Sequence, residues 1–357
     1  MKRLLPASLA LAVALCITGC DSNKPTTTGP LLPNKNPFPS TYQIPSAAVL
    51  VIQNANLLTG ANEQLDSTDL IVENGKITAI GADLAVPENA QVVDASGKWL
   101  TPGLIDVHSH MGVYPAPETS NHSDGNEMTS PVTAQVWAEH SVWPEDPQFE
   151  KALAGGVTTV QILPGSGNLI GGRGVTLKNV PSITVQGMKF PDAPYSLKMA
   201  CGENPKRVYG SKGILPSTRM GNMAGYRSAW IEAKAYKKTW DDYVSDFNAG
   251  LDVDPPLRDL RLETLTDVLE GDIRVHNHCY KVDEMAQMVD MAKEFGYSIA
   301  AFHHAVEGYK AAPMLAAENI CGVMWADWWG FKQEAFDMVR ENLALVDHAQ
   351  ACAIIHS

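Results

Sequence analysis

The sequence lacks an excess of basic residues. Lys and Arg number 27 among 357 residues, against 40 Asp and Glu, which leaves a net charge of −13 and a pI near 5.2. Binding to a nucleic-acid backbone requires clustered positive charge, so this balance argues against a nucleic-acid partner. Apolar residues make up 45% of the chain and charged ones 19%, a composition that can bury a sizeable core.

The sequence also lacks an apolar run of the length that a membrane-spanning helix needs, about 20 residues. The run from Leu4 to Ile17 is shorter, follows Lys2 and Arg3, and ends at Cys20. This pattern is typical of a bacterial export signal over residues 1–20. The ending Ile17-Thr18-Gly19-Cys20 resembles a lipobox, which implies acylation of Cys20 and retention in the cell envelope, on the periplasmic side of the inner membrane. Residues 21–46 are rich in Pro, Thr, Asn and Lys, and predict a flexible tether.

Cysteines are few, and two of the six belong to the signal segment. The others match neither a zinc ribbon nor a disulfide scaffold in their spacing, and three of them lie in or at the end of apolar runs. We therefore expect buried free thiols, although an exported protein could form disulfides. These four cysteines are Cys201, Cys279, Cys321 and Cys352.

Short apolar runs separated by turn residues fill residues 47–103 and predict a small β-sheet domain. Asn74-Gly75 predicts a tight hairpin, because these two residues tolerate the positive φ angles of a type I′ turn. From residue 104 to 357 the apolar runs no longer alternate with polar residues, as expected for parallel strands that are covered on both faces. Helical patterns follow three of them, over 282–295, 307–318 and 331–346, which favours an α/β fold of the (β/α)8 barrel (TIM-like) type.

The middle of this barrel is harder to interpret. SITVQGM and SLKMAC both look like strands, yet only about seven residues separate them, too few for a helical crossover. This leaves open whether both belong to the barrel. The neighbouring glycines of Gly165–Asn168 and Gly171–Gly174 lack the lysine of a phosphate-binding loop and predict a flexible loop at the barrel mouth.

The chemistry begins at the first predicted barrel strand, which ends in His108-Ser109-His110. Residues two apart in a strand point the same way, so both imidazoles can reach one ion. A small sheet that closes in Trp99-Leu100-Thr101-Pro102-Gly103 and leads into such a strand resembles the amidohydrolase superfamily. The resemblance implies that His108 and His110 are metal ligands.

The same resemblance implies one further histidine ligand on each of the fifth and sixth strands. Arg274-Val275-His276-Asn277-His278 matches the fifth, and His303-His304-Ala305-Val306-Glu307-Gly308 matches the sixth. We favour His276 and His304 as ligands, with His278 and His303 as close competitors that otherwise contact substrate. Four histidines at strand ends indicate a functional site, because functional residues of this barrel gather at its C-terminal face.

A second ion would need a bridging group, which the superfamily takes from a carboxylated lysine or a glutamate. Lys198 in SLKMAC is the candidate lysine, and Glu203 in Glu203-Asn204-Pro205-Lys206-Arg207 is the candidate carboxylate. That run resembles the imidazolonepropionase-like subgroup. The expected cofactor is a divalent metal, Zn²⁺ by ligand type, as one or two ions. Asp327 and Trp328, after the seventh strand, could line the substrate pocket.

The resemblance implies a metal-dependent hydrolase that uses a metal-activated water to cleave carbon–nitrogen bonds of a small-molecule amide or cyclic amide. Its catalytic residue would be an aspartate at the end of the eighth strand, whereas this sequence ends at His356-Ser357, so we expect the barrel to be truncated there and that aspartate to lie beyond Ser357. Two alternatives remain: a dipeptidase of the same superfamily, and a noncatalytic lipoprotein that binds a metal or a solute.

Overall fold

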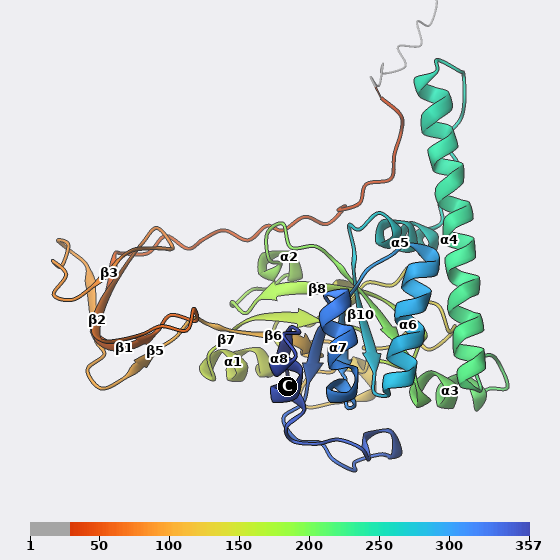
Figure 1. Ribbon diagram of the computed structural model, residues 1–357. Coiled ribbons are helices and arrows are strands. Elements are labelled where there is room, and N and C mark those ends of the chain that lie inside the picture. The colour runs from red at the N-terminus through yellow and green to blue at the C-terminus, as the bar shows by residue number, and fades with distance from the viewer. Residues whose placement is uncertain (1–28) are drawn as a thin grey trace, which may run out of the picture.

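The computed structural model describes residues 29–357, so the signal segment and Cys20 lie outside the described residues. A small β-sheet lies to one side of a larger α/β part whose helices line the outer face of a curved sheet (Figure 1). Across residues 29–357, none of the helices combines the length and apolar character needed to cross a membrane.

The small sheet has the strand order β3-β2-β1-β4, with β5 paired to β1. Asn74 and Gly75 join β2 to β3 with φ angles of 51° and 73°, as the predicted type I′ turn requires. Only Thr101, Pro102 and Gly103 separate β5 from the first strand of the larger sheet. The five strands are β1 (Leu50–Leu58), β2 (Gln64–Glu73), β3 (Lys76–Gly81), β4 (Gln91–Asp94) and β5 (Trp99–Leu100).

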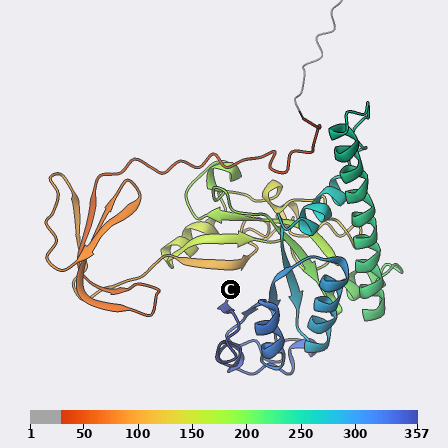
Figure 2. The same cartoon turned by 45° about the horizontal axis from the view of Figure 1, so that its top comes forward.

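The larger sheet has eight strands, which lie side by side in chain order and curl into part of a barrel (Figure 2). All neighbours are parallel except β8, which runs antiparallel to both β7 and β9. The predicted all-parallel barrel is therefore wrong at this one strand. The eight strands are β6 (Leu104–Ser109), β7 (Val157–Ile162), β8 (Ile170–Lys178), β9 (Ser196–Ala200), β10 (Arg274–Cys279), β11 (Ile299–His304), β12 (Cys321–Met324) and β13 (Ala353–Ile355).

Seven of these strands, all but β8, coincide with apolar runs that the sequence marks as strands. One run that the sequence marks as a strand does not form one. This run, SITVQGM, contains the short helix α2 (Val185–Met188), which is capped by the Thr184 side chain. The third strand is instead β8, which falls partly in the glycine-rich segment predicted as a flexible loop. Because SITVQGM is not a strand, the small gap between the two runs does not have to hold a crossover. The connection from β8 to β9 is residues 179–195, and antiparallel neighbours need no crossover helix.

Close packing explains why β8 is rich in glycine. Residues 132–137 run against it, with isolated bridges from Val132 to Ile170 and from Trp137 to Arg173. Gly172 has a φ of +114°, and a Cβ atom there would lie 2.3 Å from the Val136 carbonyl oxygen. Only glycine allows this approach. The glycines thus mark a buried strand under a neighbouring chain segment, and the prediction of a mobile loop at Gly171–Gly174 is wrong.

Two of the three predicted barrel helices are confirmed, while 331–346 forms only a short turn and a late helix. Phe331 packs on Trp325, and the Trp328 amide donates to Met338 Sδ, so aromatic packing holds this stretch out of helical geometry. The helices are α1 (Pro147–Ala154), α2 (Val185–Met188), α3 (Glu203–Gly210), α4 (Arg219–Asn248), α5 (Leu260–Leu269), α6 (Val282–Phe295), α7 (Gly308–Glu318) and α8 (Asn342–His348). The 3-10 turns are η1 (Ser120–His122), η2 (Ala138–His140) and η3 (Gln333–Ala335).

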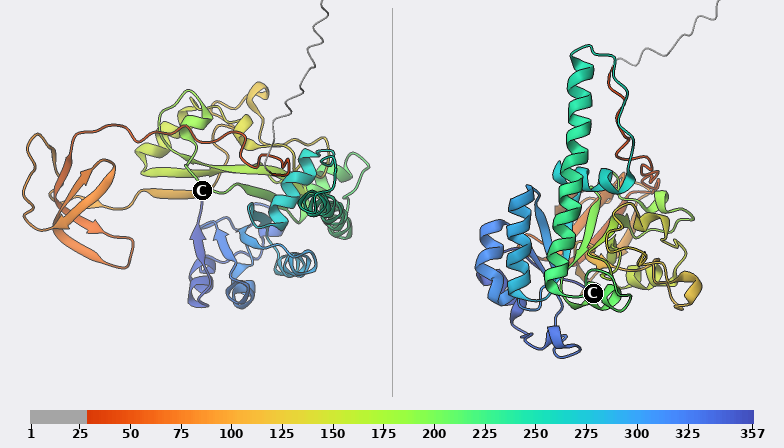
Figure 3. Two further views of the ribbon diagram at one scale, coloured as in Figure 1. Left: turned by 90° about the horizontal axis from the view of Figure 1, so that it is seen from above. Right: turned by 90° about the vertical axis from the view of Figure 1, so that its right-hand side faces the viewer.

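The long helix α4 is absent from the sequence-based predictions. It has 30 residues, or about 45 Å, and its far end extends beyond the sheet layer (Figure 3). Tyr226, Ala229, Trp230 and Ala233 are buried, which places the packed face mainly in the first half of the helix. The second half therefore presents more of its surface to solvent.

The four cysteines form two disulfides, Cys201–Cys279 and Cys321–Cys352. The expectation of free thiols is therefore wrong. The partners stand 78 and 31 residues apart in sequence, and they meet because β9 pairs with β10 and β12 pairs with β13. The spacing of the cysteines along the chain does not predict this pairing, because the sulfur atoms meet only through the order of the strands in the sheet.

Residues 29–46 contain no helix or strand, as a tether would, but they lie along the larger part of the molecule. The Ser40 hydroxyl donates to the Lys189 carbonyl, the Thr41 amide donates to the Gln186 carbonyl, and the Lys189 amine donates to the Phe38 carbonyl. Lys35 forms an ion pair with Glu270 at 2.5 Å. The described part of the predicted tether is thus docked on the α/β part, which differs from the expectation of a free segment.

Candidate metal centre

His108 is the centre of a buried histidine cluster. Its Nδ1 lies 2.9 Å from His303 Nδ1, and its Nε2 lies 3.4 Å from His110 Nε2. His110 is oriented from its other side, because its Nδ1 bonds to the Leu163 carbonyl at 2.8 Å, which makes this nitrogen the donor. The strand β6 therefore directs both imidazoles to the inside of the curved sheet, as the alternation of a strand requires.

The register between β10 and β11 adds three more rings. His278 lies opposite His303, and His276 Nδ1 lies 2.8 Å from His303 Nε2. The Gln161 amide, on β7, lies 3.4 Å from the other nitrogen of His276. The structure thus brings His276, His278 and His303 to the same inner face, next to the cluster. The sequence predicted one histidine ligand from each of these two strands, whereas β10 alone places two histidines there.

His304 reaches the cluster through an unusual backbone geometry. It follows His303, so regular alternation would place its ring on the outer face. Its φ is +68° and that of Ala305 is +32°, and this left-handed turn brings the ring back to within 4.8 Å of the His108 ring centroid. Positive φ costs about 1–3 kcal/mol for a non-glycine residue and concentrates at functional sites. The fold therefore sustains strain in order to place this imidazole.

His356, at the end of β13, completes the inner group. Its ring stacks on His108 with centroids 5.0 Å apart and planes 15° apart. Each of His108, His304 and His356 offers a nitrogen, and these three atoms lie within 4.8 Å of one another in a buried site. His356 was absent from the ligands expected from the sequence, and its place at the end of a predicted barrel strand was the signal that could have found it.

Lys198 points into the same cluster from β9. Its Nζ lies 3.1 Å from His108 Nε2, and 1% of its surface is exposed. Burial lowers the pKa of Lys198 to about 7. Burial, together with the nearby Lys198 charge, also lowers the pKa of His110 to about 4 and that of His276 to about 3. These imidazoles are therefore neutral at pH 7, the form that binds a cation.

Glu203, the other candidate for a bridging group, lies elsewhere. It begins α3, and its carboxylate lies 3.3 Å from the Lys332 amine. That amine sits over the Tyr280 ring at 4.1 Å, and Tyr280 in turn stacks on His278. Of the two bridging candidates, the structure brings Lys198 to the histidines and places Glu203 with Lys332 at the rim.

Aromatic side chains after β12 cover the cluster. Trp325 stacks on His304 with centroids 4.0 Å apart, and Trp328 stacks on Trp325 at 4.8 Å. Trp328 is 48% exposed, so it can meet a molecule that enters from solvent. Asp327 instead forms an ion pair with Arg340 at 2.8 Å. The structure therefore connects Trp328 to the site through a ring stack and pairs Asp327 with another residue.

Sequence reasoning missed a carboxylate beside the cluster. Asp106 Oδ1 accepts from the His108 amide at 3.2 Å, and its Oδ2 accepts from the Ser357 hydroxyl at 2.9 Å. Burial raises the pKa of Asp106 above its ordinary value. Asp106 and His110 line a cavity of about 620 Å³ that continues to Tyr114 and Gln148. This cavity gives the cluster a route to solvent next to a carboxylate on the same strand.

The chemistry of the donor set fits a divalent metal. Both nitrogens of His278, Nδ1 of His304 and Nε2 of His356 are buried without a hydrogen-bond partner. A buried polar atom without a partner costs about 1–3 kcal/mol, and lone pairs of neutral imidazoles are suitable partners for a cation. The residues present therefore fit a metal, with His108, His304 and His356 as the closest set.

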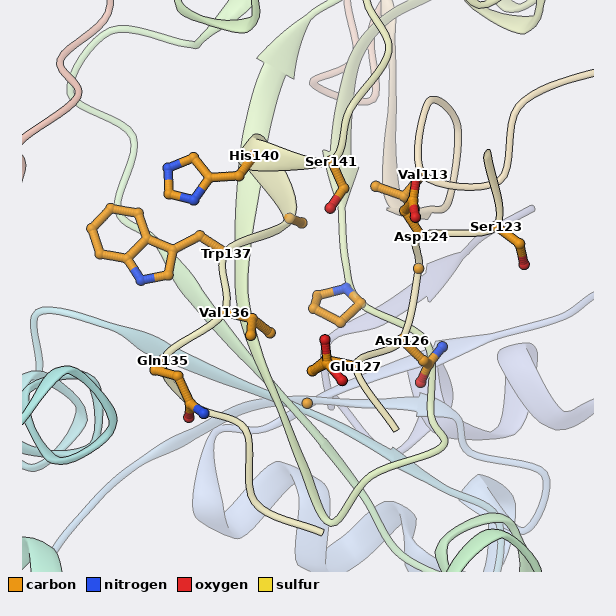
Figure 4. A pocket seen from close by; sticks show the side chains of 14 residues that line it. Val113, Ser123, Asp124, Asn126, Glu127, Gln135, Val136, Trp137, His140 and Ser141 are labelled. Carbon is orange, nitrogen blue, oxygen red and sulfur yellow. The ribbon is translucent and has the colours of Figure 1, made fainter. Parts of the chain in front are cut away.

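A separate cavity of about 380 Å³ lies between residues 113–141 and the start of β8 (Figure 4). Asp124 and Glu127 line it on one side, and Trp137 and His140 on the other (Figure 4). None of the clustered histidines and neither Lys198 nor Asp106 belongs to its lining. It is therefore distinct from the candidate metal centre.

Nitrogen donors that meet inside a curved α/β sheet, at the ends of its parallel strands, define the class of barrel proteins with metal-binding capacity. A search of family models returned no match. A solved amidohydrolase from Thermotoga maritima is 35% identical, with a TM-score of 0.79 over 86% of this chain and 78% of that one. The chain belongs to the amidohydrolase superfamily.

Two curated relatives agree with this assignment. An amidohydrolase, tasK, from Hapsidospora irregularis is 37% identical over 290 residues, which are 77% of this chain. A dihydroorotase from Trichlorobacter lovleyi is 40% identical over 62 residues, or 17% of this chain. The chain spans 28% of the first relative's length and 15% of the second's.

Proposed function

We propose that this protein is a divalent-metal-dependent hydrolase that cleaves a carbon–nitrogen bond in a small amide or cyclic amide. The observation that carries the proposal is the buried triad of His108, His304 and His356, whose nitrogens lie within 4.8 Å of one another. Unpartnered nitrogens on His304 and His356 support it. The name of the dihydroorotase relative, an enzyme of a cyclic substrate, favours a cyclic amide over a peptide.

A bound ion would polarise the scissile carbonyl and lower the pKa of a water molecule. The residues of this chain prepare the site for that chemistry. The carbonyl of Leu163 fixes the orientation of His110, and His303 links His108 to His276 through nitrogen contacts of 2.9 and 2.8 Å. Trp325 covers His304 and excludes water from that side, which strengthens electrostatic interactions within the site.

Lys198 is the residue that we propose to hold a second ion. Its amine is buried beside His108, and no carboxylate lies within ion-pairing distance of it in residues 29–357. An unpaired buried amine is costly. Addition of dissolved CO₂ to the neutral amine, with release of a proton, would convert it to a carbamate, which is an anionic oxygen ligand. In this proposal Zn²⁺ is the preferred metal, because the remaining donors are imidazole nitrogens.

The test is a metal assay joined to a turnover assay. The protein, purified with any residues encoded after Ser357 included, is expected to hold one to two equivalents of divalent metal by mass spectrometry. It is also expected to hydrolyse cyclic amides such as dihydroorotate, with activity lost to a chelator and restored by Zn²⁺. Dipeptides are assayed beside the cyclic amides. Preferred cleavage of dipeptides would overturn the substrate class, and bound metal with no turnover of either class would favour a binding protein instead.

We also propose that the protein is exported and anchored in the cell envelope through Cys20. Two disulfides support this placement, because disulfides persist in oxidising compartments such as the periplasm. The acidic surface implied by a net charge of −13 is compatible with attachment by lipid rather than by charge.

Changing Cys20 to alanine is expected to abolish labelling by a radioactive fatty acid and to move the protein from the membrane fraction to the supernatant. The reason is that acylation needs this thiol, and acyl chains hold a protein by about 0.8 kcal/mol per buried methylene. Cys16→Ala, four residues earlier, is the control and should retain both label and membrane location. Membrane retention of the Cys20 variant would argue against the anchor.

A further inference from the structure

The outer face of β8 carries a second feature that the metal centre does not use. Arg173 lies opposite Leu197, and its neighbour Gly172 lies opposite Lys198. Since successive strand residues point to opposite faces, Lys198 enters the histidine cluster while Arg173 projects to the outside of the sheet. Whatever gathers around Arg173 is therefore separated from the metal centre by the sheet itself.

Within residues 29–357, β8 has no crossover helix of its own on this outer face, because it is antiparallel to both neighbours and needs none. The face is covered instead by residues 32–38, by the loop that carries Trp137, and by α4 and α5. This cover is incomplete and leaves a cavity of about 650 Å³ that is lined by parts of all four segments. A volume of this size is typical of small-molecule sites.

The walls of the cavity are mostly apolar and aromatic. Phe38 packs edge-on against Trp137 at 5.7 Å, and Arg173 stacks over the Trp137 ring at 4.2 Å. Trp240, Val244 and Leu260 contribute from the two helices. Trp137 and His140 also line the neighbouring cavity, where Figure 4 shows them side by side. Aromatic rings in the walls favour a ligand that is itself flat and apolar.

The polar atoms around the cavity indicate which charge and which hydrogen-bonding groups the ligand should have. Asp267 is paired with Arg173 at 3.0 Å, Glu263 with Arg258 at 2.7 Å, and Glu270 with Lys35 at 2.5 Å. The acidic groups are therefore satisfied. Two N–H donors are not, because Arg173 Nη1 and Trp240 Nε1 are buried and have no hydrogen-bond partner. The Thr266 hydroxyl, which can donate or accept, is also buried without a partner.

Arg173 is the more informative of the two donors. Its side chain is 4% exposed, its Nε donates to Thr264 Oγ1 at 2.8 Å, and its charge is matched by Asp267. A guanidinium whose charge is already balanced has no need of a second anion, while its free N–H still needs an acceptor. An uncharged oxygen acceptor meets this requirement.

We propose that this cavity is a binding site for a small, flat, uncharged aromatic molecule that bears a hydrogen-bond-accepting oxygen. The ring packs against Phe38, Trp240 and Val244, and the oxygen accepts from Arg173. The site is independent of the metal centre, because it lies on the other face of the sheet. Residues 32–38 form part of its wall, so the ligand also stabilises the docking of that segment.

Benzamide, benzoate and toluene are the probes that test this proposal. They share one ring and differ in carrying a neutral acceptor, a charged acceptor or none. Binding is measured by ligand-observed NMR titration on the purified protein, with and without a chelator. Benzamide is expected to bind saturably and at least about tenfold more tightly than benzoate or toluene, and the chelator should leave its affinity unchanged.

Two variants locate the binding. Val244→Trp fills the cavity and should weaken benzamide binding at least about tenfold, whereas Asp242→Trp, on the exposed side of the same helix, should not. Trp240→Phe keeps the ring, removes its donor and serves as a second variant, with about a fivefold loss expected. Equal affinity in the Val244 variant, a preference for benzoate or toluene, loss of binding with the chelator, or no saturable binding would each overturn the proposal.

Discussion

Replacement of His108 by alanine is expected to lower bound divalent metal by about a hundredfold or more, and hydrolytic turnover with it. His108 contacts His303 at 2.9 Å, Lys198 at 3.1 Å and His110 at 3.4 Å. Its loss therefore removes a nitrogen ligand for the metal and also the contacts that orient these three side chains. Even residues that only orient metal ligands change affinity by about 10–100-fold when mutated, and a direct donor should exceed this. Metal content is measured by mass spectrometry after dialysis.

The control for this variant is His122→Ala. His122 is exposed in a 3-10 turn and packs only against Trp143 at 5.3 Å among the rings around it. Its replacement should leave metal content and turnover unchanged. Unfolding transitions of both variants are compared, so that a general loss of structure is recognised. Equal metal content in the two variants would show that His108 is not a ligand.

Replacement of Glu139 by alanine is expected to lower the free energy of unfolding by about 3–5 kcal/mol. Glu139 Oε2 lies 2.9 Å from the Lys189 amine, with side chains that are 0% and 6% exposed, and the Tyr195 hydroxyl donates to the other oxygen at 2.8 Å. Removing one partner of a buried pair leaves the other charge uncompensated. The urea midpoint and slope measure the change.

A surface pair provides the comparison for this second experiment. Lys238 and Asp242 lie 2.5 Å apart on α4, with side chains that are 73% and 59% exposed. Solvent screens such pairs, so Asp242→Ala should leave the urea midpoint unchanged within error. If the two variants shift the midpoint equally, burial of the Glu139 pair does not determine its contribution.

Much of the fold follows from local sequence patterns. The runs around His108, His276 and His304 are apolar, and each forms the expected parallel strand. Predicted helices follow the runs of His276 and His304. The hairpin at Asn74 also follows from local chemistry, because Asn74 and Gly75 both adopt the positive φ angles of the predicted turn. These features depend on neighbours in sequence, which is why pattern reasoning finds them.

The errors concern contacts between distant segments. The glycines of β8 make sense only once residues 132–137 are known to lie on that strand. The disulfide partners of Cys201 and Cys352 depend on strand order, which spacing does not encode. His304 was favoured as a ligand, but the positive φ that brings its ring inward could not be predicted, because pattern reasoning assigns regular geometry to every strand.

The candidate site shows the same division. Its position at the ends of barrel strands could be predicted, because parallel strands share one polarity. The choice between Lys198 and Glu203 could not, since it depends on which side chain faces inward. The position of Asp106 beside the cluster was not predicted either, because the His-x-His motif includes only the two histidines that follow it.

The reversed strand β8 also has a consequence for polarity. Each antiparallel junction inverts the direction of the chain, and β8 makes two of them, with β7 and with β9. Because the number of inversions is even, β9 to β13 regain the direction of β6 and β7. Lys198 and the later histidines therefore emerge toward the same end as His108. With a single inversion the donors would have been divided between opposite ends of the barrel, and no ion could have bridged them.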